Sequence, residues 1–516
     1  MFINPLLLTD GYKTGHHQQY PEGTTLVYSN FTPRSNKYAP RGCEKIVSFG
    51  PQLVTKQIHE AFEFGFFQQP KHEVCGEMKR ELSLYLNTDY DVSHFEALHD
   101  LGYLPVHIKA LPEGTLVPMK VPVLVIYNTH PDFYWITNYL ETIISNLMWK
   151  PMTSATIAHE YRKILTKWQE KTDKERAWFI DWQGHDFSMR GMDSAEAVVA
   201  SGLGHLTSFS GSDSLPTIYG ARKYYGETGF VCGSVNATEH SVMCAGTKDD
   251  EVDTFRRLLE TYPTGILSVV SDTWDLWKVC TSHVVELKEE ILARDGKLVI
   301  RPDSGDPCDI VCGYNTLGDY DLHEKGVTAN PSEPAFKGVI ELLWDVFGGT
   351  VNEQGYKVLD PHIGAIYGDS ITLDRAEEIC RRLESKGFAS TNIVLGVGSF
   401  TYQFNTRDTF GFAMKATYVE VCEVWGTSDI TGMPIKILVG REIFKSPITD
   451  DGTKKSATGL LRVVQNEESG SLKLLDKQTW EEENSNDNLL ETIYKDGEFV
   501  KMTTLTEIRE RIKAQL

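Results

Sequence analysis

Acidic, basic and imidazole side chains gather at the ends of short apolar segments in the middle of this sequence. The segment GSVNATEH ends in Glu239 and His240, and the next one, LSVVSD, ends in Asp272. An imidazole gains and releases a proton near neutral pH, and a neighbouring carboxylate can orient it and raise its pKa. Because the chain has 15 histidines, a purely structural histidine is the alternative interpretation, and the residues around His240 argue against it.

Two further segments end in residues suited to a phosphorylated sugar. The segment IRPDSGDP supplies Arg301, whose planar guanidinium matches a phosphate, and Asp303, whose carboxylate suits ribose hydroxyls or Mg²⁺. The segment YGDS repeats the pattern with Gly368 and Asp369. The alternative for the first segment is a solvated turn, which the letters PDSG favour by themselves.

A glycine-rich turn and an aromatic residue complete the set. In LGVGSF the backbone amide of Gly398 could hold a phosphate, although the sequence has no full GxGxxG dinucleotide motif. Phe187 in HDFSMRG offers an aromatic face, and Asp213 in GSDS offers a carboxylate. Together these residues predict a pocket for a phosphorylated sugar and a flat ring. Arg190 adds a cation three residues after Phe187. Further candidates are Arg407 and Lys415, either of which could instead be a surface charge.

From about residue 177 onward, apolar segments with polar ends recur at a regular interval. Apolar segments ending in Gly, Ser, Asp or His alternate with helix-like stretches, and most steps are roughly 30 residues, the size of a strand–helix unit. Such parallel strands can close into a barrel, in which the residues just past each strand meet at one mouth. A doubly wound open sheet is the alternative. The strand-like segments are AWFIDWQG, LTSFSGSD, GSVNATEH, ILSVVSDTWD, KLVIRPDSGD, IGAIYGDS and NIVLGVGS.

A chain of 516 residues is longer than one core usually serves, so two domains are expected. Residues 1–150 mix strand-like pieces (106–128) with a buried helix (133–149), and residues 151–409 carry the barrel. Residues 410–516 lose the regular interval and contain strand-like segments that could return to the first part. The sequence therefore predicts an α/β barrel and a second, strand-rich α+β domain built from both chain ends.

Composition and charge limit the partners. The net charge of −21 repels nucleic acid at long range. No apolar run is long enough to span a membrane, and the N-terminus does not resemble a signal peptide. Nine cysteines without a CxxC motif predict a reduced, cytoplasmic protein without a zinc site. The sequence also lacks GxSxG and HExxH motifs, and no lysine has the setting of a Schiff base, which argues against a barrel aldolase.

At this level the sequence resembles the nicotinamide phosphoribosyltransferases of the type II phosphoribosyltransferase family. The match is specific because it rests on many motifs in the family's order, from near residue 5 to about 465. The motifs are TDGYKTGHHQQYPEGT, HDFSMRG, GSDS, EHSV, SVVSDTWD, IRPDSGDP, YGDSI and TRDTFGFAMK. The resemblance implies an incomplete, seven-stranded α/β barrel, a second α+β domain, and a homodimer whose active sites are shared between subunits.

The resemblance also implies a reaction. Nicotinamide would be joined to 5-phosphoribosyl 1-pyrophosphate, giving nicotinamide mononucleotide and pyrophosphate in NAD salvage. It implies that Mg²⁺ is required and bound mainly through pyrophosphate, and that ATP hydrolysis is coupled through a phosphorylated histidine, His240. Nicotinate phosphoribosyltransferase activity on the same fold is the alternative, as is a non-catalytic binding protein that kept the fold. Asp213 favours the amide over the acid, and intact His240, Asp303 and Asp369 argue for turnover.

Roles for individual residues follow from the resemblance. Phe187 and Tyr12 of the partner subunit would sandwich the pyridine ring, Asp213 would accept a hydrogen bond from the carboxamide, and Asp272 would hydrogen-bond His240. The other implied contacts are Arg190 near the amide and phosphate, Ser234 and Val235 along the ring's tunnel, Arg301, Asp303, Gly368 and Asp369 at the ribose and its phosphate, Gly398 at the 5′-phosphate, and Arg34, Arg407 and Lys415, partly across the dimer, at pyrophosphate or ATP phosphates.

The sequence departs from the family pattern at two places. Ser399 stands where the family has a glycine, which puts the phosphate contacts of that turn in question. Residues 418–446 form a longer segment than in vertebrate enzymes, and its Lys445 could cover the ATP site or belong to a surface loop.

Overall fold

The computed structural model describes residues 3–427, 433–445, 448–449 and 456–516. The chain divides into two compact units. Unit 1 comprises Met1–Thr156, Ala221–Thr228 and Asn405–Gln515, and unit 2 comprises Ile157–Gly220, Gly229–Phe404 and Leu516. Unit 1 thus combines both chain ends, and one boundary falls inside helix α6 (Glu141–Thr172). The piece 221–228 belongs to unit 1, although the sequence placed it in the barrel domain.

Unit 2 contains a parallel sheet of seven strands in the order β7-β6-β14-β13-β10-β9-β8. Its two outer strands also meet, because a parallel bridge joins Gly211 to Gly233, just before β8. There the Ser212 amide donates to the Gly233 carbonyl at 3.1 Å. The ring of strands confirms the α/β barrel, and the open-sheet alternative is wrong. The strands are β6 (Gly184–Asp186), β7 (Gly211–Ser212), β8 (Asn236–Ala237), β9 (Thr264–Val270), β10 (Asp295–Arg301), β13 (Ile363–Tyr367) and β14 (Ile393–Val397).

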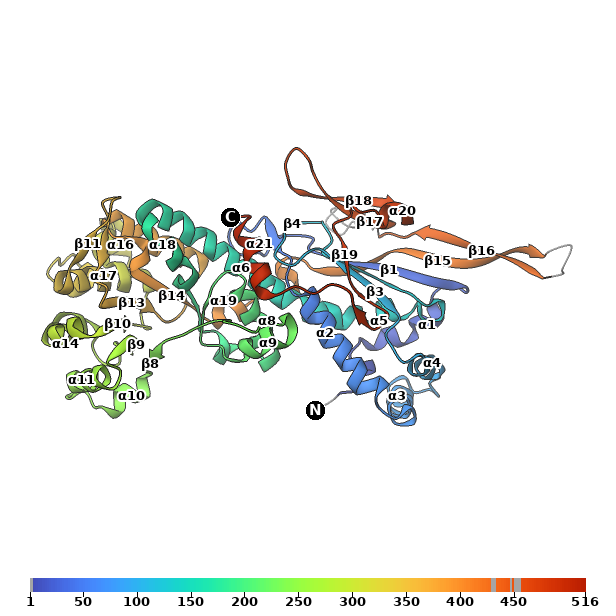
Figure 1. Cartoon of the computed structure of the whole chain (residues 1–516), viewed down its shortest axis with the longest axis horizontal. Helices are drawn as coiled ribbons and strands as arrows, with labels where there is room; N and C mark the ends of the chain where they lie inside the picture. The colour runs from blue at the N-terminus through green and yellow to red at the C-terminus, as the bar shows by residue number, and fades with distance from the viewer. Residues whose placement is uncertain (1–2, 428–432, 446–447, 450–455) are drawn as a thin grey trace. The chain divides into compact units, whose positions relative to one another are not determined.

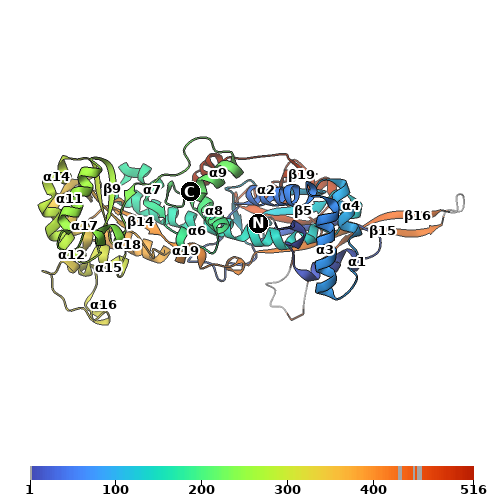
Figure 2. The ribbon, with the colours of Figure 1, turned by 90° about the horizontal axis from the view of Figure 1, so that it is seen from below.

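Helices surround these strands on the outside, and Figure 2 shows α11, α14, α17 and α18 around β9 and β14. Their apolar faces pack on the strands in one cluster that includes Phe255 of α11, Leu343 of α17 and Ile379 of α18, all fully buried. Burial of these faces holds the strand register that positions the site. The main helices are α8 (Ala195–Leu206), α9 (Pro216–Tyr225), α10 (His240–Ala245), α11 (Glu251–Thr261), α14 (Lys288–Ala293), α15 (Pro307–Cys312), α17 (Pro334–Phe347), α18 (Leu373–Ser385) and α19 (Ser399–Gln403).

The first three barrel strands are shorter than the sequence predicted. In AWFIDWQG the apolar residues lie on helical turns that end with α7 (Ile180–Gln183), and the strand begins only at Gly184. In LTSFSGSD, Phe209 follows α8 and packs in the barrel core together with Ile180. An apolar run marks burial but does not distinguish a buried helix end from a buried strand, which is why the predicted strands began too early.

Unit 1 is built on a second seven-stranded sheet, in the order β16-β15-β1-β5-β3-β19-β20 (Figure 1). Every neighbouring pair in it is antiparallel, and the three strands from the start of the chain lie in the middle, flanked on each side by two strands from its end. This confirms the second, strand-rich domain built from both ends. The strands are β1 (Thr24–Thr32), β3 (Val106–Ala110), β5 (Leu124–Asn128), β15 (Ala413–Thr427), β16 (Pro434–Glu442), β19 (Glu491–Lys495) and β20 (Glu498–Phe499).

The helices of unit 1 include the predicted buried one. Residues 136–172 form α5 (Ile136–Tyr139) and α6, so the helix runs well beyond the predicted end at residue 149. The other helices of at least eight residues are α2 (Pro51–Phe62), α3 (Lys71–Leu86), α4 (Ser93–Leu101) and α21 (Leu505–Lys513). Short pairs of strands, β2 (Lys45–Val47) with β4 (Leu116–Pro118) and β17 (Leu460–Gln465) with β18 (Leu472–Gln478), complete the unit.

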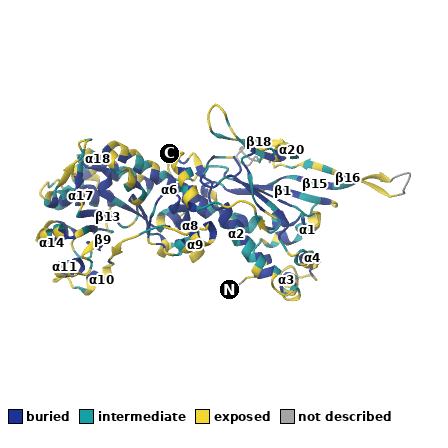
Figure 3. Ribbon diagram, viewed as in Figure 1, coloured by how far each residue is buried: buried dark blue, intermediate teal, exposed yellow. Residues whose placement is uncertain are grey.

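The longer segment noted in the sequence forms the hairpin of β15 and β16. The part of β15 beyond Val421 pairs with β16 alone, and its side chains change from buried to exposed (Figure 3). Residues 428–432, 446–447 and 450–455 of the segment lie outside the described residues. Lys445 is exposed, and its amide donates to Ser456 Oγ at 3.2 Å. Among the described residues, no helix is long and apolar enough to cross a membrane.

A buried ion pair in unit 2 gives a stability prediction. Arg382 on α18 and Asp309 on α15 are 2% and 5% exposed, and Arg382 Nη1 lies 2.9 Å from Asp309 Oδ1. Arg382→Ala removes one partner of a buried carboxylate and leaves Lys325, whose Nζ lies 2.6 Å from Asp309 Oδ2. We therefore expect it to lower the free energy of unfolding by about 3 kcal/mol, the lower end of the range for breaking a buried pair. The neighbouring Arg381→Ala removes only an exposed pair with Glu378 and should cost less than about 1 kcal/mol. Urea unfolding of both variants, followed by circular dichroism, tests this, and equal losses would contradict it.

Candidate active site

Residues just past the strands of unit 2 meet at the mouth of the barrel. The carboxyl ends of parallel strands point to one side, so side chains far apart in sequence become neighbours. Each of the seven strands is followed within three residues by at least one predicted site residue. These residues are Phe187 after β6, Asp213 after β7, His240 after β8, Asp272 after β9, Asp303 after β10, Gly368 and Asp369 after β13, and Gly398 after β14.

Two adjoining cavities open at this mouth and share Phe187, Asp213 and Arg301. The polar cavity, of about 690 Å³, is also lined by Asp303 and Asp369. The aromatic cavity, of about 550 Å³, runs into the barrel. The first therefore suits a charged, hydroxylated ligand, and the second suits a flat ring. Other residues of the polar cavity are Met189, Arg190, Ser214, Gly368 and Ser399, and those of the aromatic cavity include Trp178, Phe179, Trp182, Phe230, Ser234, Val235 and Ile266.

His240 is the first residue of α10, and its side chain is 48% exposed. Its Nε2 atom lies 3.1 Å from Asp303 Oδ1, and its Nδ1 atom lies 3.1 Å from Thr273 Oγ1. The predicted hydrogen bond from His240 to Asp272 is not formed, since Asp272 Oδ1 is 3.9 Å from Nε2. The turn after β10 instead brings Asp303 to the imidazole. The ring is thus held at both nitrogens, with one edge beside two carboxylates.

Asp272 holds the turn that carries Asp303. Its Oδ2 atom accepts from the backbone amides of Asp303 and Ser304 at 3.0 and 2.9 Å, and from Ser304 Oγ at 2.5 Å. Its Oδ1 atom is buried and has no hydrogen-bond partner among the described residues. Ligand atoms of His240, Asp272 and Asp303 all lie within 4.8 Å of one another. Two carboxylates with an unpartnered oxygen fit a divalent cation such as Mg²⁺.

Asp213 is held as an anion at the junction of the two cavities. Its Oδ1 atom accepts from His185 Nε2 at 2.9 Å and from the Ser234 hydroxyl. Burial alone would raise the pKa of Asp213, but the hydrogen bond and charge of His185, the Ser234 hydroxyl and the charge of Arg301 hold it below the ordinary value of 3.8. His185 was not predicted as a site residue. Its position two residues before Phe187 in a strand, on the same face, is the signal that could have found it.

Arg301 supplies positive charge to both cavities. Burial lowers the pKa of its guanidinium, while the carboxylates of Asp303, Asp213 and Asp272 raise it. Its Nε atom is buried and has no hydrogen-bond partner among the described residues. A buried donor of this kind costs about 1–3 kcal/mol when unpaired, and a bound phosphate or amide oxygen would satisfy it. Lys297, also on β10, lines the aromatic cavity, and burial lowers its pKa to about 8; it was not predicted.

The turn after β14 is tightly packed around its glycines and Ser399. A Cβ at Gly398 would lie 3.1 Å from Asp369 Oδ1, and a Cβ at Gly396 would lie 2.8 Å from the Phe187 ring. Ser399 faces the polar cavity and packs against Gly191, next to Arg190. The serine is therefore accommodated by the neighbouring turn and offers a hydroxyl to the cavity.

The remaining predicted residues lie in unit 1. Tyr12 is 66% exposed on the 3₁₀ turn Gly11–Gly15. Desolvation lowers the pKa of Lys415; Glu141 raises it, and the positive charges of Arg34, Lys445 and Arg407 lower it further. Lys415, Arg34, Lys445 and Arg407 therefore form a cationic cluster within unit 1.

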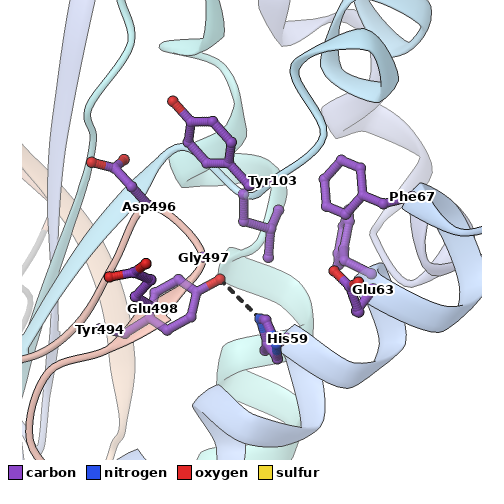
Figure 4. A pocket seen from close by; sticks show the side chains of 10 residues that line it. His59, Glu63, Phe67, Tyr103, Tyr494, Asp496, Gly497 and Glu498 are labelled. Atoms are coloured by element: carbon purple, nitrogen blue, oxygen red, sulfur yellow. Dashed lines mark hydrogen bonds between the residues drawn. The ribbon is translucent and has the colours of Figure 1, made fainter.

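Unit 1 also has a smaller cavity, of about 200 Å³ (Figure 4). Carboxylates of Glu63, Asp496 and Glu498 surround it, and His59 Nδ1 lies 3.1 Å from the Tyr494 hydroxyl at its wall. None of the predicted site residues lines it, and its lining residues include neither lysine nor arginine. The barrel mouth therefore remains the candidate active site.

Comparison with known proteins agrees with this site. The profile of the "Nicotinate phosphoribosyltransferase (NAPRTase) family" matches residues 182–497, and that of "Nicotinamide phosphoribosyltransferase, N-terminal domain" matches residues 4–63. A nicotinamide phosphoribosyltransferase of Acinetobacter baylyi is 49% identical and covers 100% of this chain and 98% of its own. This chain belongs to the nicotinate phosphoribosyltransferase family. A second relative of that name, from Mycoplasma pneumoniae, is 34% identical over 89% of this chain and 95% of its own.

Two solved structures share the fold of this chain. Human nicotinic acid phosphoribosyltransferase matches with a TM-score of 0.53 at 16% identity, covering 98% of this chain and 93% of its own. A nicotinate-nucleotide pyrophosphorylase from Pyrococcus furiosus matches with the same TM-score and identity over 99% and 95% of the two chains. At this identity the likeness concerns the type II phosphoribosyltransferase fold, which confirms the predicted fold class.

Proposed function

We propose that this protein is a nicotinamide phosphoribosyltransferase that makes nicotinamide mononucleotide and pyrophosphate in NAD salvage. The observation that carries the choice of substrate is the anionic Asp213 beside an aromatic cavity, with Oδ1 bound by His185 and Ser234. An ionised carboxylate accepts from a neutral amide and repels the carboxylate of nicotinate. The test is product analysis after incubation with 5-phosphoribosyl 1-pyrophosphate and either pyridine, with and without ATP.

The reaction needs orientation and charge stabilisation rather than a base. The pyridine nitrogen, which carries no proton, attacks C1 of the ribose as pyrophosphate leaves. Phe187 would hold the ring in the aromatic cavity, while Asp303 and Asp369 would hold the ribose and stabilise its positive charge. Arg301 would bind phosphate with its unpartnered guanidinium edge. His240 therefore does not act as a general base in the transfer.

Mg²⁺, ATP and a second subunit belong to the same proposal. When bound, Mg²⁺ neutralises the pyrophosphate leaving group; the free oxygen of Asp272 and the carboxylate of Asp303 would assist the pyrophosphate in holding it. His240, half exposed and held at both nitrogens, would accept the phosphoryl group of ATP.

The cationic cluster of unit 1 and Tyr12 would complete the site of a partner subunit. A cytoplasmic location fits nine cysteines that are all present as thiols rather than in disulfides.

Replacing Asp213 should relax the choice of substrate. Asp213→Ser removes the negative charge and keeps a small polar side chain, so we expect the kcat/KM ratio for nicotinamide over nicotinate to fall at least about tenfold, or 1.4 kcal/mol. Steady-state kinetics with both pyridines measures the ratio. Asp193→Ser, which removes an exposed carboxylate outside both cavities, is the matched control. An unchanged ratio in a folded Asp213→Ser protein would remove the main reason for choosing the amide.

Replacing His240 should separate ATP hydrolysis from the phosphoribosyl transfer. Because the transfer needs no base, His240→Ala should abolish ATP hydrolysis and the stimulation by ATP while leaving some ATP-independent transfer. Phosphate release and nicotinamide mononucleotide formation are measured in parallel. His323→Ala, at an exposed position of α16 (Asp319–Glu324), serves as the control. Complete loss of transfer at saturating substrate in folded protein would show that His240 has a different role.

Subunit mixing tests the shared site. Tyr12 and Asp303 belong to different units, and the proposal places them in one site contributed by two subunits. Tyr12→Ala and Asp303→Ala homodimers should each have little activity, and a mixture should regain up to about a quarter of the wild-type activity, because half of the dimers in a random mixture contain one intact site of two. The recovery is measured after subunit exchange has been verified with two affinity tags. No recovery despite exchange argues against sites shared between subunits.

A further inference from the structure

His185 is held rigidly beside the candidate ring-binding site. It lies in β6, is 8% exposed, and pairs in parallel register with Gly211 of β7. A Cβ at Gly211 would come within 2.6 Å of His185 Nδ1, so only a glycine leaves room for the imidazole. On its other side the imidazole packs on Phe187, with ring centroids 4.5 Å apart at 36°. The imidazole therefore has little freedom to turn.

The imidazole donates to one oxygen of Asp213 only. A carboxylate accepts and does not donate, so His185 Nε2, at 2.9 Å from Asp213 Oδ1, must carry the proton. The Ser234 hydroxyl donates to the same Oδ1 atom. No described residue donates to Oδ2. Both protein donors thus hold one edge of the carboxylate and leave the other edge for a ligand.

This arrangement selects for a ligand that donates a hydrogen bond. The fixed Oδ2 atom can accept from the N–H₂ of a carboxamide, whereas the carboxylate of the corresponding acid has no donor to offer and carries a like charge. If the His185 donor were lost, Asp213 could rotate or bind a proton, and either change would remove the discrimination. His185 touches Asp213 and Phe187, the two residues assigned to the amide and the ring.

We propose that His185 is a positioning residue that sets the preference for a pyridine carboxamide over a pyridine carboxylate by fixing the orientation and charge of Asp213. The inference rests on the proposed function and deepens it. It assigns His185 no contact with the reacting atoms, so the residue should affect which pyridine binds more than how fast a bound pyridine reacts.

The test replaces the donor but keeps the ring. His185→Phe preserves a flat ring against Phe187 and removes the N–H. We expect the ratio of dissociation constants for nicotinate over nicotinamide, measured by isothermal titration calorimetry, to fall at least tenfold. In steady-state kinetics the KM for nicotinamide should rise while kcat stays within about threefold. His185→Gln restores an N–H donor at a similar position, and should return the ratio to within about threefold of the wild type.

A matched control separates this role from a loss of stability. His283 also donates to a buried carboxylate, with Nε2 3.1 Å from Glu251 Oε2, away from both cavities. His283→Phe should leave the ratio unchanged even if the protein becomes less stable. Should His185→Phe fail to fold, Ser234→Ala removes the other donor to Oδ1 and should shift the ratio in the same direction by a smaller factor.

The outcomes distinguish the inference from the proposed function. A wild-type protein that prefers nicotinamide, together with a folded His185→Phe protein of unchanged preference, overturns the inference and leaves the proposed function standing. An equal fall of the ratio in His283→Phe overturns it as well, because the effect would then be one of general stability. A wild-type protein that binds neither pyridine overturns both.

Discussion

The contact between Gly211 and Gly233 that closes the barrel is the constraint on which the candidate site depends. The backbone bonds around it bring the residues before β8 against β7, and Ser234 thereby reaches Asp213. Side chains at either glycine would interfere, with His185 at Gly211 and with Trp182 at Gly233. The backbone contact that closes the ring therefore also brings Ser234 to Asp213, and a barrel left open at this seam would lose both contacts.

The barrel mouth combines acidic side chains with the positive charge of Arg301, in a chain whose net charge is negative. A protein of net charge −21 must bind an anionic sugar phosphate, and the mouth itself holds Asp213, Asp303 and Asp369. These carboxylates are compatible with that ligand because a ribose offers hydroxyl donors and becomes positively charged at C1 during transfer. Arg301 supplies the compensating charge from within the barrel, where its field is least screened by solvent. The cationic cluster of unit 1 is of the sign that the pyrophosphate would require.

The sequence was sufficient for the parts of the structure that follow from periodicity. Alternating apolar segments and polar strand ends predicted the barrel and brought residues from all seven strands to one mouth. The sequence was insufficient for the side-chain contacts that depend on the geometry of the loops. The turn after β10 places Asp303 nearer to His240 than Asp272, and no spacing rule distinguishes two carboxylates at neighbouring strand ends. The sequence does not predict His185 as a site residue, because its role arises from a cross-strand contact with Asp213. An apolar helix end such as Ile180 resembles a strand in the sequence, because the residues of both are buried.

In Asp213 and Asp272, the two carboxylate oxygens have different roles. Asp213 commits Oδ1 to His185 and Ser234, and Asp272 commits Oδ2 to the turn that carries Asp303. The second oxygen of Asp272 is buried and has no hydrogen-bond donor among the described residues, and the buried Arg301 Nε likewise has no acceptor there. The Asp213 side chain is 40% exposed, so its Oδ2 atom does not carry this cost of burial. Buried groups left unpaired oppose folding by about 1–3 kcal/mol each, and such violations of local satisfaction are expected where a ligand completes the set. The anchored oxygens fix where the free ones point, so the fold sets both the identity and the direction of the groups offered to a substrate before any substrate arrives.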